Sequence, residues 1–248
     1  MIKCAIKNVM KRLGLRVMRG SDWDAWYESD GLHSVHNHDF LKEPTFQAAL
    51  ARGLKSDENL GFMTWRLHVA LWAAKHASAL PGDFVECGVN RGFLSSAVMK
   101  HLDWNRLNRT FFLFDTFQGI ATELLCEVEV EAGRLEHNKQ YTECYEATVR
   151  NFAEFERVKL VKGVVPESLS EVEIERVAYL SIDMNCAHAD TEAFEYFWPR
   201  LSSGAVVLID DYAYNGFEST YVAFNKLAAQ YRIPILSLPT GQGVIIKA

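Results

Sequence analysis

The sequence lacks several features that would assign it to a common class. No apolar run reaches the roughly 20 residues that a membrane-spanning helix needs, and the first residues lack the apolar core and cleavage site of a signal peptide. The five cysteines are odd in number and include no C-x-x-C pair, so they indicate neither a disulfide framework nor a zinc site. We therefore expect a cytoplasmic protein with reduced thiols.

The chain also lacks a surplus of basic residues outside its first segment. Its net charge is −6, but residues 1–19 carry +6 and no acid, which leaves −12 for the remainder. An acidic body of this kind argues against nucleic-acid binding. Within residues 1–19 apolar residues recur at three- and four-residue spacing, which predicts one apolar helical face. That face either contacts a membrane surface weakly or packs on the body or on a second subunit.

What the sequence does contain is an alternation of apolar strands and helices. Strands are expected at 83–89, 110–115, 157–163, 177–183, 204–210, 233–238 and 243–248, and helices at 61–80, 91–102, 190–201 and 218–231. Such alternation predicts an α/β fold with a doubly wound, Rossmann-like parallel sheet. We expect an N-terminal helical and irregular extension over residues 1–60, one domain over 61–248, and a polar lid insertion at about 118–150.

The stretch "VECGVNRG" predicts a cofactor site, since ligands of such sheets bind at the carboxyl ends of the strands. It follows the pattern E-x-G-x-x-x-G, with Glu86 and Gly88 at the end of a strand. Asp115 ends the next strand, where an acid can bind a ribose diol. The pyrophosphate-binding G-x-G-x-x-G pattern and a Tyr-x-x-x-Lys pair are both missing, which disfavours a nicotinamide cofactor and favours S-adenosylmethionine.

Three carboxylates predict a metal site. Asp183 ends one expected strand, and Asp210 and Asp211 end the next one along the chain. If these strands are neighbours, the three side chains converge, and their mutual repulsion is relieved by a hard divalent cation, Mg²⁺ first and then Mn²⁺. The alternative is that one acid caps a helix and another pairs with a basic side chain.

Several stretches together resemble the macrocin O-methyltransferase (TylF/MycF-like) family, namely "FMTWRL", "PGDFVECGVNRG", "LFDTFQGI", "VKGVVPESL", "LSIDMN" and "GAVVLIDDY". They span about residues 60–248. The resemblance implies an S-adenosylmethionine- and Mg²⁺-dependent sugar O-methyltransferase with a seven-stranded sheet whose last strand is antiparallel. It also implies a homodimer or larger homo-oligomer and a sugar-containing acceptor.

The same resemblance implies the residues of both sites. The metal ligands are Asp183, Asp210 and Asp211, and Asp183 thereby takes a catalytic role. The cofactor-site residues are Glu86, Gly88, Asn90, Arg91, Gly92, Asp115, Thr116 and Gly163, with Thr64 and Ser95 as further candidates.

The chain departs from the family pattern at one position. Family members usually read D-x-D, the second Asp being a proposed general base, where this chain has Asp183-Met184-Asn185. Asn185 cannot accept a proton. His188 is the nearest candidate base in sequence, and His36 and His38 become candidates if their segment forms a lid. Trp23, Trp26 and Trp65 are candidates for stacking on a sugar, or for packing in the core.

Two other functions remain compatible with these residues. A catechol-type O-methyltransferase would use the same metal chemistry on an aromatic diol. A non-catalytic scaffold could keep the fold without turnover. The class of acceptor and the proton acceptor are the two points that the sequence leaves open.

Overall fold

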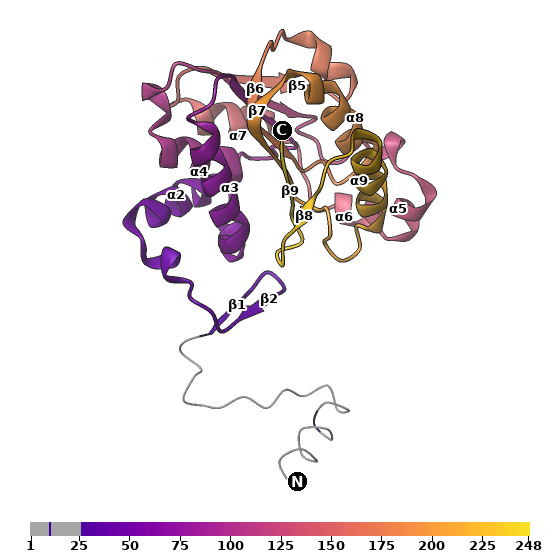
Figure 1. Ribbon diagram of the computed structural model, residues 1–248, viewed down its shortest axis with the longest axis horizontal. Coiled ribbons are helices and arrows are strands. Elements are labelled where there is room, and N and C mark those ends of the chain that lie inside the picture. Colours follow the sequence, from indigo (N-terminus) through magenta and orange to yellow (C-terminus); the bar gives the residue numbers. More distant parts are fainter. Residues whose placement is uncertain (1–9, 11–25) are drawn as a thin grey trace. The chain divides into compact units, whose positions relative to one another are not determined.

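The computed structural model describes Met10 and residues 26–248 (Figure 1). It divides into two compact units, one ending at Asp39 and the other comprising Phe40–Ala248. The amphipathic face expected within residues 1–19 and the candidate Trp23 lie outside the described residues. Among the described helices, none is long and apolar enough to cross a membrane. The described cysteines outside that segment are free thiols, as predicted: Cys87, Cys126, Cys144 and Cys186.

The first unit contains a short antiparallel hairpin of β1 (Tyr27–Ser29) and β2 (Leu32–Ser34). Asp30 and Gly31 between the strands both have positive φ, which is the conformation that a two-residue hairpin turn requires. The ring of Trp26 packs edge-on against His33, with the centroids 5.2 Å apart.

The larger unit is built on a seven-stranded sheet with the order β5-β4-β3-β6-β7-β9-β8. Strands β3 to β7 run parallel, and β9 is antiparallel to β7. The prediction of a doubly wound sheet with a final antiparallel strand is confirmed. The strands are β3 (Asp83–Cys87), β4 (Phe111–Asp115), β5 (Val158–Lys162), β6 (Val177–Ile182), β7 (Leu201–Ile209), β8 (Leu236–Ser237) and β9 (Gly243–Ile246).

The sheet is buried on both faces, because alternate side chains of each strand point to opposite sides. Phe84 joins one core cluster, which includes α3 and α4 residues, whereas Val85 joins another, which includes α8 and α9 residues. In Figure 1, α2, α3 and α4 lie on one side of the sheet and α8 and α9 on the other. The helices are α2 (Pro44–Leu54), α3 (Thr64–Ala77), α4 (Phe93–Leu102), α5 (Glu127–Glu131), α6 (Arg134–Asn138), α7 (Tyr145–Phe152), α8 (Ala187–Phe197) and α9 (Glu218–Tyr231).

Two elements differ from the sequence-based expectation. The strand expected at 233–238 is reduced to the two residues of β8, and Pro234 just before it has no N–H to donate to a ladder. Helix α2 lies inside the expected helical and irregular extension 1–60, but it belongs to the larger unit, which begins at Phe40; there Gly53 leaves room for the ring of Phe93.

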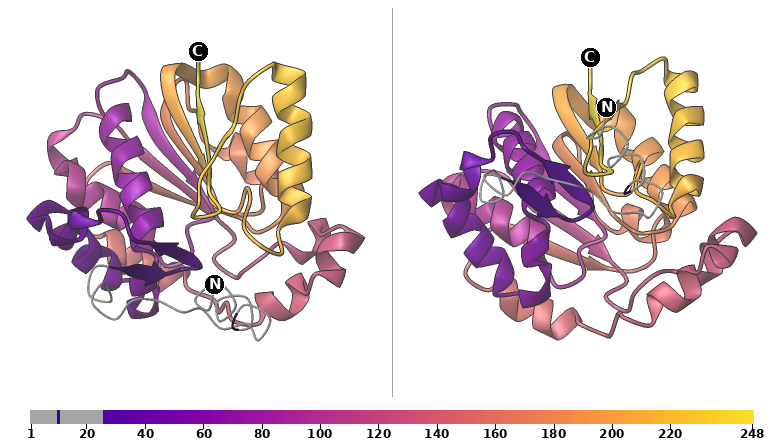
Figure 2. Two further views of the ribbon diagram at one scale, coloured as in Figure 1. Left: turned by 60° about the horizontal axis from the view of Figure 1, so that its bottom comes forward. Right: turned by 90° about the horizontal axis from the view of Figure 1, so that it is seen from below.

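The insertion between β4 and β5 forms α5, α6 and α7 and is anchored to the starts of two other helices. Glu129 Oε1 accepts hydrogen bonds from the backbone N of Ala187 (2.8 Å) and from Ser219 Oγ (3.1 Å). Arg134 donates to the carbonyl of Gly216 (2.6 Å). Figure 2 shows the insertion, in pink, running past the lower edge of the sheet toward α9. This segment therefore lies beside the carboxyl ends of the central strands.

Candidate active site

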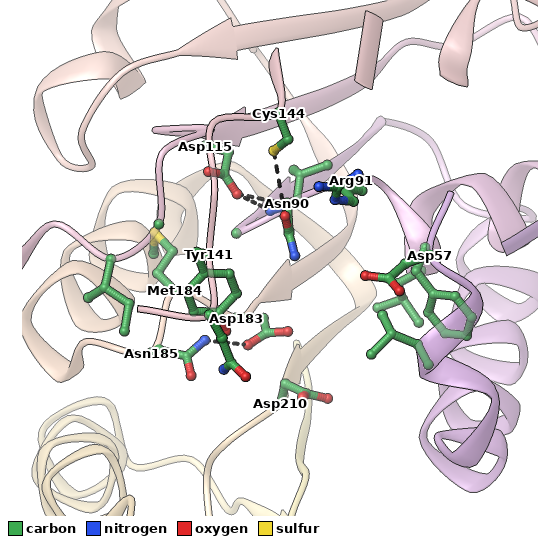
Figure 3. A pocket seen from close by; sticks show the side chains of 18 of the residues that line it. Asp57, Asn90, Arg91, Asp115, Tyr141, Cys144, Asp183, Met184, Asn185 and Asp210 are labelled. Carbon is green, nitrogen blue, oxygen red and sulfur yellow. Dashed lines mark hydrogen bonds between the residues drawn. The ribbon is translucent and has the colours of Figure 1, made fainter. Parts of the chain in front are cut away.

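A cavity of about 1010 Å³ opens at the carboxyl ends of β3, β4, β6 and β7 (Figure 3). Besides these strand ends, its walls come from the segment between α2 and α3, the insertion, and the loop after β7. The site residues predicted from sequence that line it are Glu86, Gly88, Asn90, Arg91, Asp115, Thr116, Gly163, Asp183, Asp210 and Asp211.

The turn after β3 requires glycine for a steric reason. Gly88 has φ +91°, and a Cβ at this position would lie 1.9 Å from the carbonyl oxygen of Asp183. The backbone at the end of β6 thus passes directly against the turn. Gly92 has φ +85°, and a Cβ there would lie 2.4 Å from the ring of Phe152. The two glycines therefore allow the close approach of β6 and α7 to the start of α4.

Asp115 holds this turn in place. Its Oδ2 accepts hydrogen bonds from the backbone N of Val89 (2.6 Å) and of Asn90 (2.7 Å), and its Oδ1 accepts from the backbone N of Phe117 (2.5 Å). Burial raises the pKa of Asp115, and these bonds from N–H groups oppose the rise. The carboxylate therefore orders the turn and also faces the cavity.

Glu86 is a buried acid with an unsatisfied oxygen. It is 3% exposed, and its Oε2 has no hydrogen-bond partner in the described part of the chain. Burial raises its pKa to about 8; the neighbouring Ser95 opposes the rise, and the charges of Asp115 and Asp210 add to it. An unpaired buried acid is costly, so a ligand that donates a hydrogen bond or carries a positive charge is favoured here.

Asp183 and Asp210 stand side by side because of the strand register. Ile182 of β6 pairs with Ile209 of β7, so the residue after each strand lies at the same height. Asp210 is buried together with Arg66 of α3, and its Oδ2 lies 2.6 Å from Arg66 Nη1. Its Oδ1 accepts a hydrogen bond from Gln242 Nε2 (3.0 Å). Arg66 is therefore the counter-charge of this carboxylate.

The ionised forms of the remaining carboxyl groups are disfavoured. Burial raises the pKa of Asp183 and of Asp211 well above the usual range, and the charge of Asp210 raises both further, while Arg66 opposes the rise. This pattern is expected when several carboxylates share one small volume. Asp210 therefore lies close enough to Asp183 and Asp211 to act on both, and their convergence on a metal ion stays a prediction.

The fit of these carboxylates to a metal ion is mixed. All the donors are oxygens, which suits a hard divalent cation, and carboxylate oxygens keep a lone pair after one hydrogen bond. Within residues 26–248, however, no three His, Cys, Asp or Glu side chains are arranged as a ready-made metal site. The carboxylate oxygens suit a cation, but Arg66 already neutralises part of the negative charge that the cation would neutralise.

The loop after β6 has a strained turn that aims Asn185 back toward Asp183. Asn185 has φ +59°, a left-handed conformation that asparagine tolerates better than most residues. Its Nδ2 donates to Asp183 Oδ1 at 3.2 Å (Figure 3). The buried Asp190 accepts a hydrogen bond from the backbone N of Met184 (3.1 Å) and fixes the same loop.

Other candidates are not brought into the cavity. His188 is not among the lining residues; its side chain is 52% exposed and lies 4.0 Å from Glu192. It occupies the solvent side of α8, since Ala189 and Ala193 face the core. Thr64, Ser95 and Gly92 also lie outside the lining, Ser95 being fully buried on α4 beside Glu86.

The candidate aromatic and histidine side chains of the N-terminal half have other surroundings. Trp65 packs against Phe40 (4.7 Å between centroids) and His68 (5.5 Å). It therefore has the core-packing role. His36 and His38 belong to the first unit, so their proposed action as a lid over the cavity stays a prediction.

Among the cavity residues that the sequence reasoning missed are Arg66, His137, Tyr141 and Tyr214. An arginine among apolar residues in "TWRLHVAL" is a usable signal for a buried ion pair. The sequence gives no such signal for the two insertion residues, His137 and Tyr141, because the apolar residues of this segment show no regular spacing from which its position on the sheet could be predicted.

Comparison with known proteins identifies the family. A family model described as macrocin-O-methyltransferase (TylF) matches residues 66–235. The chain belongs to the macrocin O-methyltransferase family. The matched residues include most of the sheet and all three carboxylates, so membership rests on the part of the chain that forms the cavity.

Similar curated proteins are O-methyltransferases by their names. One is 8-demethyl-8-(2,3-dimethoxy-alpha-L-rhamnosyl)-tetracenomycin-C 4'-O-methyltransferase of Streptomyces olivaceus, 31% identical over 148 residues, 55% of each chain. Another is mycinamicin III 3''-O-methyltransferase of Micromonospora griseorubida, 30% identical over 54% of this chain and 56% of the relative. The match thus spans about half the length of these curated relatives.

Solved structures confirm the fold. The O-methyltransferase NovP superposes with a TM-score of 0.70 at 19% identity and covers 86% of this chain and 100% of NovP. The calicheamicin methyltransferase CalS11 gives a TM-score of 0.56 at 17% identity, covering 93% of this chain and 98% of CalS11. The sheet order and the added antiparallel strand are therefore those of a methyltransferase fold.

Proposed function

We propose that this protein is an S-adenosylmethionine-dependent O-methyltransferase that acts on a hydroxyl of a sugar-containing acceptor. The observation that carries the proposal is the unpartnered, buried Oε2 of Glu86 in a cavity that also holds the acidic ends of β6 and β7. Family membership supports the reaction class, and the sugar-modifying relatives support the acceptor class. The methyltransferase domain in this proposal comprises residues 61–248 together with α2.

The cavity residues have distinct tasks in this mechanism. S-adenosylmethionine supplies an electrophilic methyl group on a positively charged sulfur. Glu86 offers its free oxygen to the amino group of that ligand, and Asp115 faces its ribose while holding the turn at Gly88 close. Asn90, Arg91, Thr116 and Gly163 complete the wall on that side. The chain thereby fixes the methyl group opposite the acceptor, and much of the rate enhancement comes from this positioning.

Asp183, Asp210 and Asp211 are the proposed holders of a divalent cation, Mg²⁺ or Mn²⁺. A cation held there supplies positive charge that favours loss of the acceptor's hydroxyl proton. The support is the raised pKa of Asp183 and of Asp211: burial and the neighbouring Asp210 disfavour their ionised forms, which a cation would stabilise. The same carboxylates orient the acceptor through hydrogen bonds to its hydroxyl groups.

Binding and transfer assays test the proposal separately. Calorimetry with S-adenosylmethionine should show binding, and absence of binding at millimolar ligand would instead favour a non-catalytic scaffold. Transfer of labelled methyl groups is then measured on TDP-rhamnose, on mycinamicin III and on a catechol. Methylation of the catechol alone would reject the sugar acceptor in favour of an aromatic diol.

Metal dependence has its own experiment. Excess EDTA should abolish transfer, and Mg²⁺ should restore it. Asp210→Ala should remove turnover while leaving S-adenosylmethionine binding within about threefold, because Asp210 lies on the acceptor side of the cavity. Full activity in excess EDTA would refute the metal assignment without affecting the assignment of the cofactor site.

A further inference from the structure

His137 of α6 lies beside the residue that replaces the expected acid of the D-x-D pattern. The side chain of Asn185 lies close enough to His137 to raise its pKa, and the amide nitrogen of Asn185 donates to Asp183 Oδ1 (3.2 Å). His137 and Asn185 both line the cavity. The insertion therefore brings a titratable side chain to the position where Asn185 removed one.

Tyr141 links the same histidine to the carboxylates. Its hydroxyl lies 3.3 Å from His137 Nε2, and the two rings meet edge-on with centroids 5.7 Å apart. The charges of Asp183 and Asp211, together with burial, raise the pKa of Tyr141, which places its phenol close to both acids. Figure 3 shows Tyr141 beside Asn185 and Asp183. The Tyr141 hydroxyl therefore contacts His137 and lies toward the two acids.

The surroundings of His137 favour its neutral form. The titratable and charged groups around it are Arg134 on its own helix and Tyr141, with Asp183 and Asp211 beyond Tyr141. Across the cavity its ring faces Phe217, which is apolar. Burial lowers the pKa of His137, the positive charge of Arg134 lowers it further, and only the side chain of Asn185 opposes this. The neutral imidazole has a lone pair on one ring nitrogen; Gln140 Nε2 lies 2.9 Å from His137 Nε2 and 3.2 Å from Nδ1, and the Tyr141 hydroxyl lies 3.3 Å from Nε2.

We propose that His137 is the proton acceptor of the methyl transfer, in place of the acid that Asn185 has replaced. The inference rests on the proposed function. The Tyr141 hydroxyl takes the proton of the acceptor hydroxyl and gives its own proton to the imidazole, while the acceptor oxygen bonds to the methyl carbon. The carbon–sulfur bond breaks with its electron pair remaining on sulfur. The products are a methyl ether, a neutral thioether and an imidazolium that later releases its proton to water.

The geometry also separates His137 from the histidine nearest in sequence. His188 is exposed beside Glu192 and does not line the cavity, although it lies only three residues from Asn185. His137 lies 48 positions before Asn185 and reaches it because Glu129 and Arg134 fix the insertion against the starts of α8 and α9. His188→Ala is accordingly the matched control.

The test measures kcat against pH for methyl transfer to TDP-rhamnose or mycinamicin III. The wild-type kcat should fall as pH drops through the pKa of His137, since an imidazolium cannot accept a proton. His137→Ala should lose about 10²-fold in kcat at pH 7.5 and lose this acid limb, with little change in S-adenosylmethionine binding. His188→Ala should keep the wild-type kcat and the wild-type acid limb. Added imidazole should restore part of the activity of His137→Ala, which a purely structural role would not allow.

Two results would overturn the assignment. One is a His137→Ala variant with wild-type kcat and an unchanged acid limb. The other comes from an NMR titration of the imidazole signals in the wild-type protein, independent of any acceptor: a His137 that is still protonated at pH 8 cannot be the base. If the wild-type protein methylates no acceptor, the proposed function fails, and the titration still decides the state of His137.

Discussion

The buried acid Glu86 makes a quantitative prediction about stability. Its pKa of about 8 in the folded protein compares with an ordinary value of 4.5. Between these two values the folded state holds a proton that the unfolded state releases. Stability should therefore fall as pH rises through this window, because the unfolded state binds fewer protons.

The size of the effect follows from the linkage relation. One pKa unit corresponds to about 1.4 kcal/mol, so the contribution of Glu86 between pH 6 and pH 8 is a loss of about 2 kcal/mol of unfolding free energy in the ligand-free protein. For a chain of this length, that corresponds to a drop in Tm of about 4–8 °C. Glu86→Gln has no proton to lose and should lack this part of the decrease.

The assay is thermal unfolding of the ligand-free wild type and Glu86→Gln at pH 6, 7 and 8. Other buried acids, such as Asp190 with a pKa raised to about 7 by burial, contribute to both proteins and largely cancel in the difference. Glu146→Gln, an exposed change on α7, controls for loss of one surface charge. If the wild type and Glu86→Gln show the same dependence of Tm on pH, the pKa of Glu86 is not raised in the folded protein, and the argument from its burial is wrong.

Two further predictions concern the packing and charge of the site. Gly88→Ala should destabilise the protein by about 3 kcal/mol or more, since its Cβ would meet the Asp183 carbonyl. Gly133 also has a positive φ (+88°), but no atom lies within 4 Å of a Cβ placed there, so Gly133→Ala should lower the free energy of unfolding by only about 1 kcal/mol. Urea titrations of both variants measure this, and equal losses would contradict the steric argument. Arg66→Gln should lower the free energy of unfolding by about 3–5 kcal/mol and should increase the rise in Tm that Mg²⁺ causes. An unchanged rise would mean that Mg²⁺ does not bind at these carboxylates.

Much of the sheet could be predicted from sequence because buried parallel strands are short, continuous apolar runs. The run at 204–209 and its neighbour at 177–182 are adjacent as expected, and this adjacency is what brought Asp183 and Asp210 together. Strand ends at which an acid follows an apolar run are readable without any tertiary information.

The rest of the site depends on contacts between distant segments. His137 reaches Asn185 only because Glu129 and Arg134 hold the insertion, and neither of these contacts follows a local pattern. The choice of His188 followed distance along the chain, whereas the helical phase of α8 turns that side chain to solvent. Helix α2 lies in the extension that was expected to be helical and irregular, but its packing against Phe93 of α4 was not predicted, because that contact joins distant segments.

The side chain of Glu129 has a consequence for attempts to exchange acceptor specificity among relatives. Cys186 makes no side-chain capping bond at the start of α8, and the carboxylate of Glu129 accepts the hydrogen bond of the first backbone N–H instead. The insertion therefore caps the helix that carries Asp190. A transplanted insertion without an acid at this position would leave that amide unpaired and loosen the loop holding Asp183. Chimeric enzymes should therefore exchange the insertion and the start of α8 as one module.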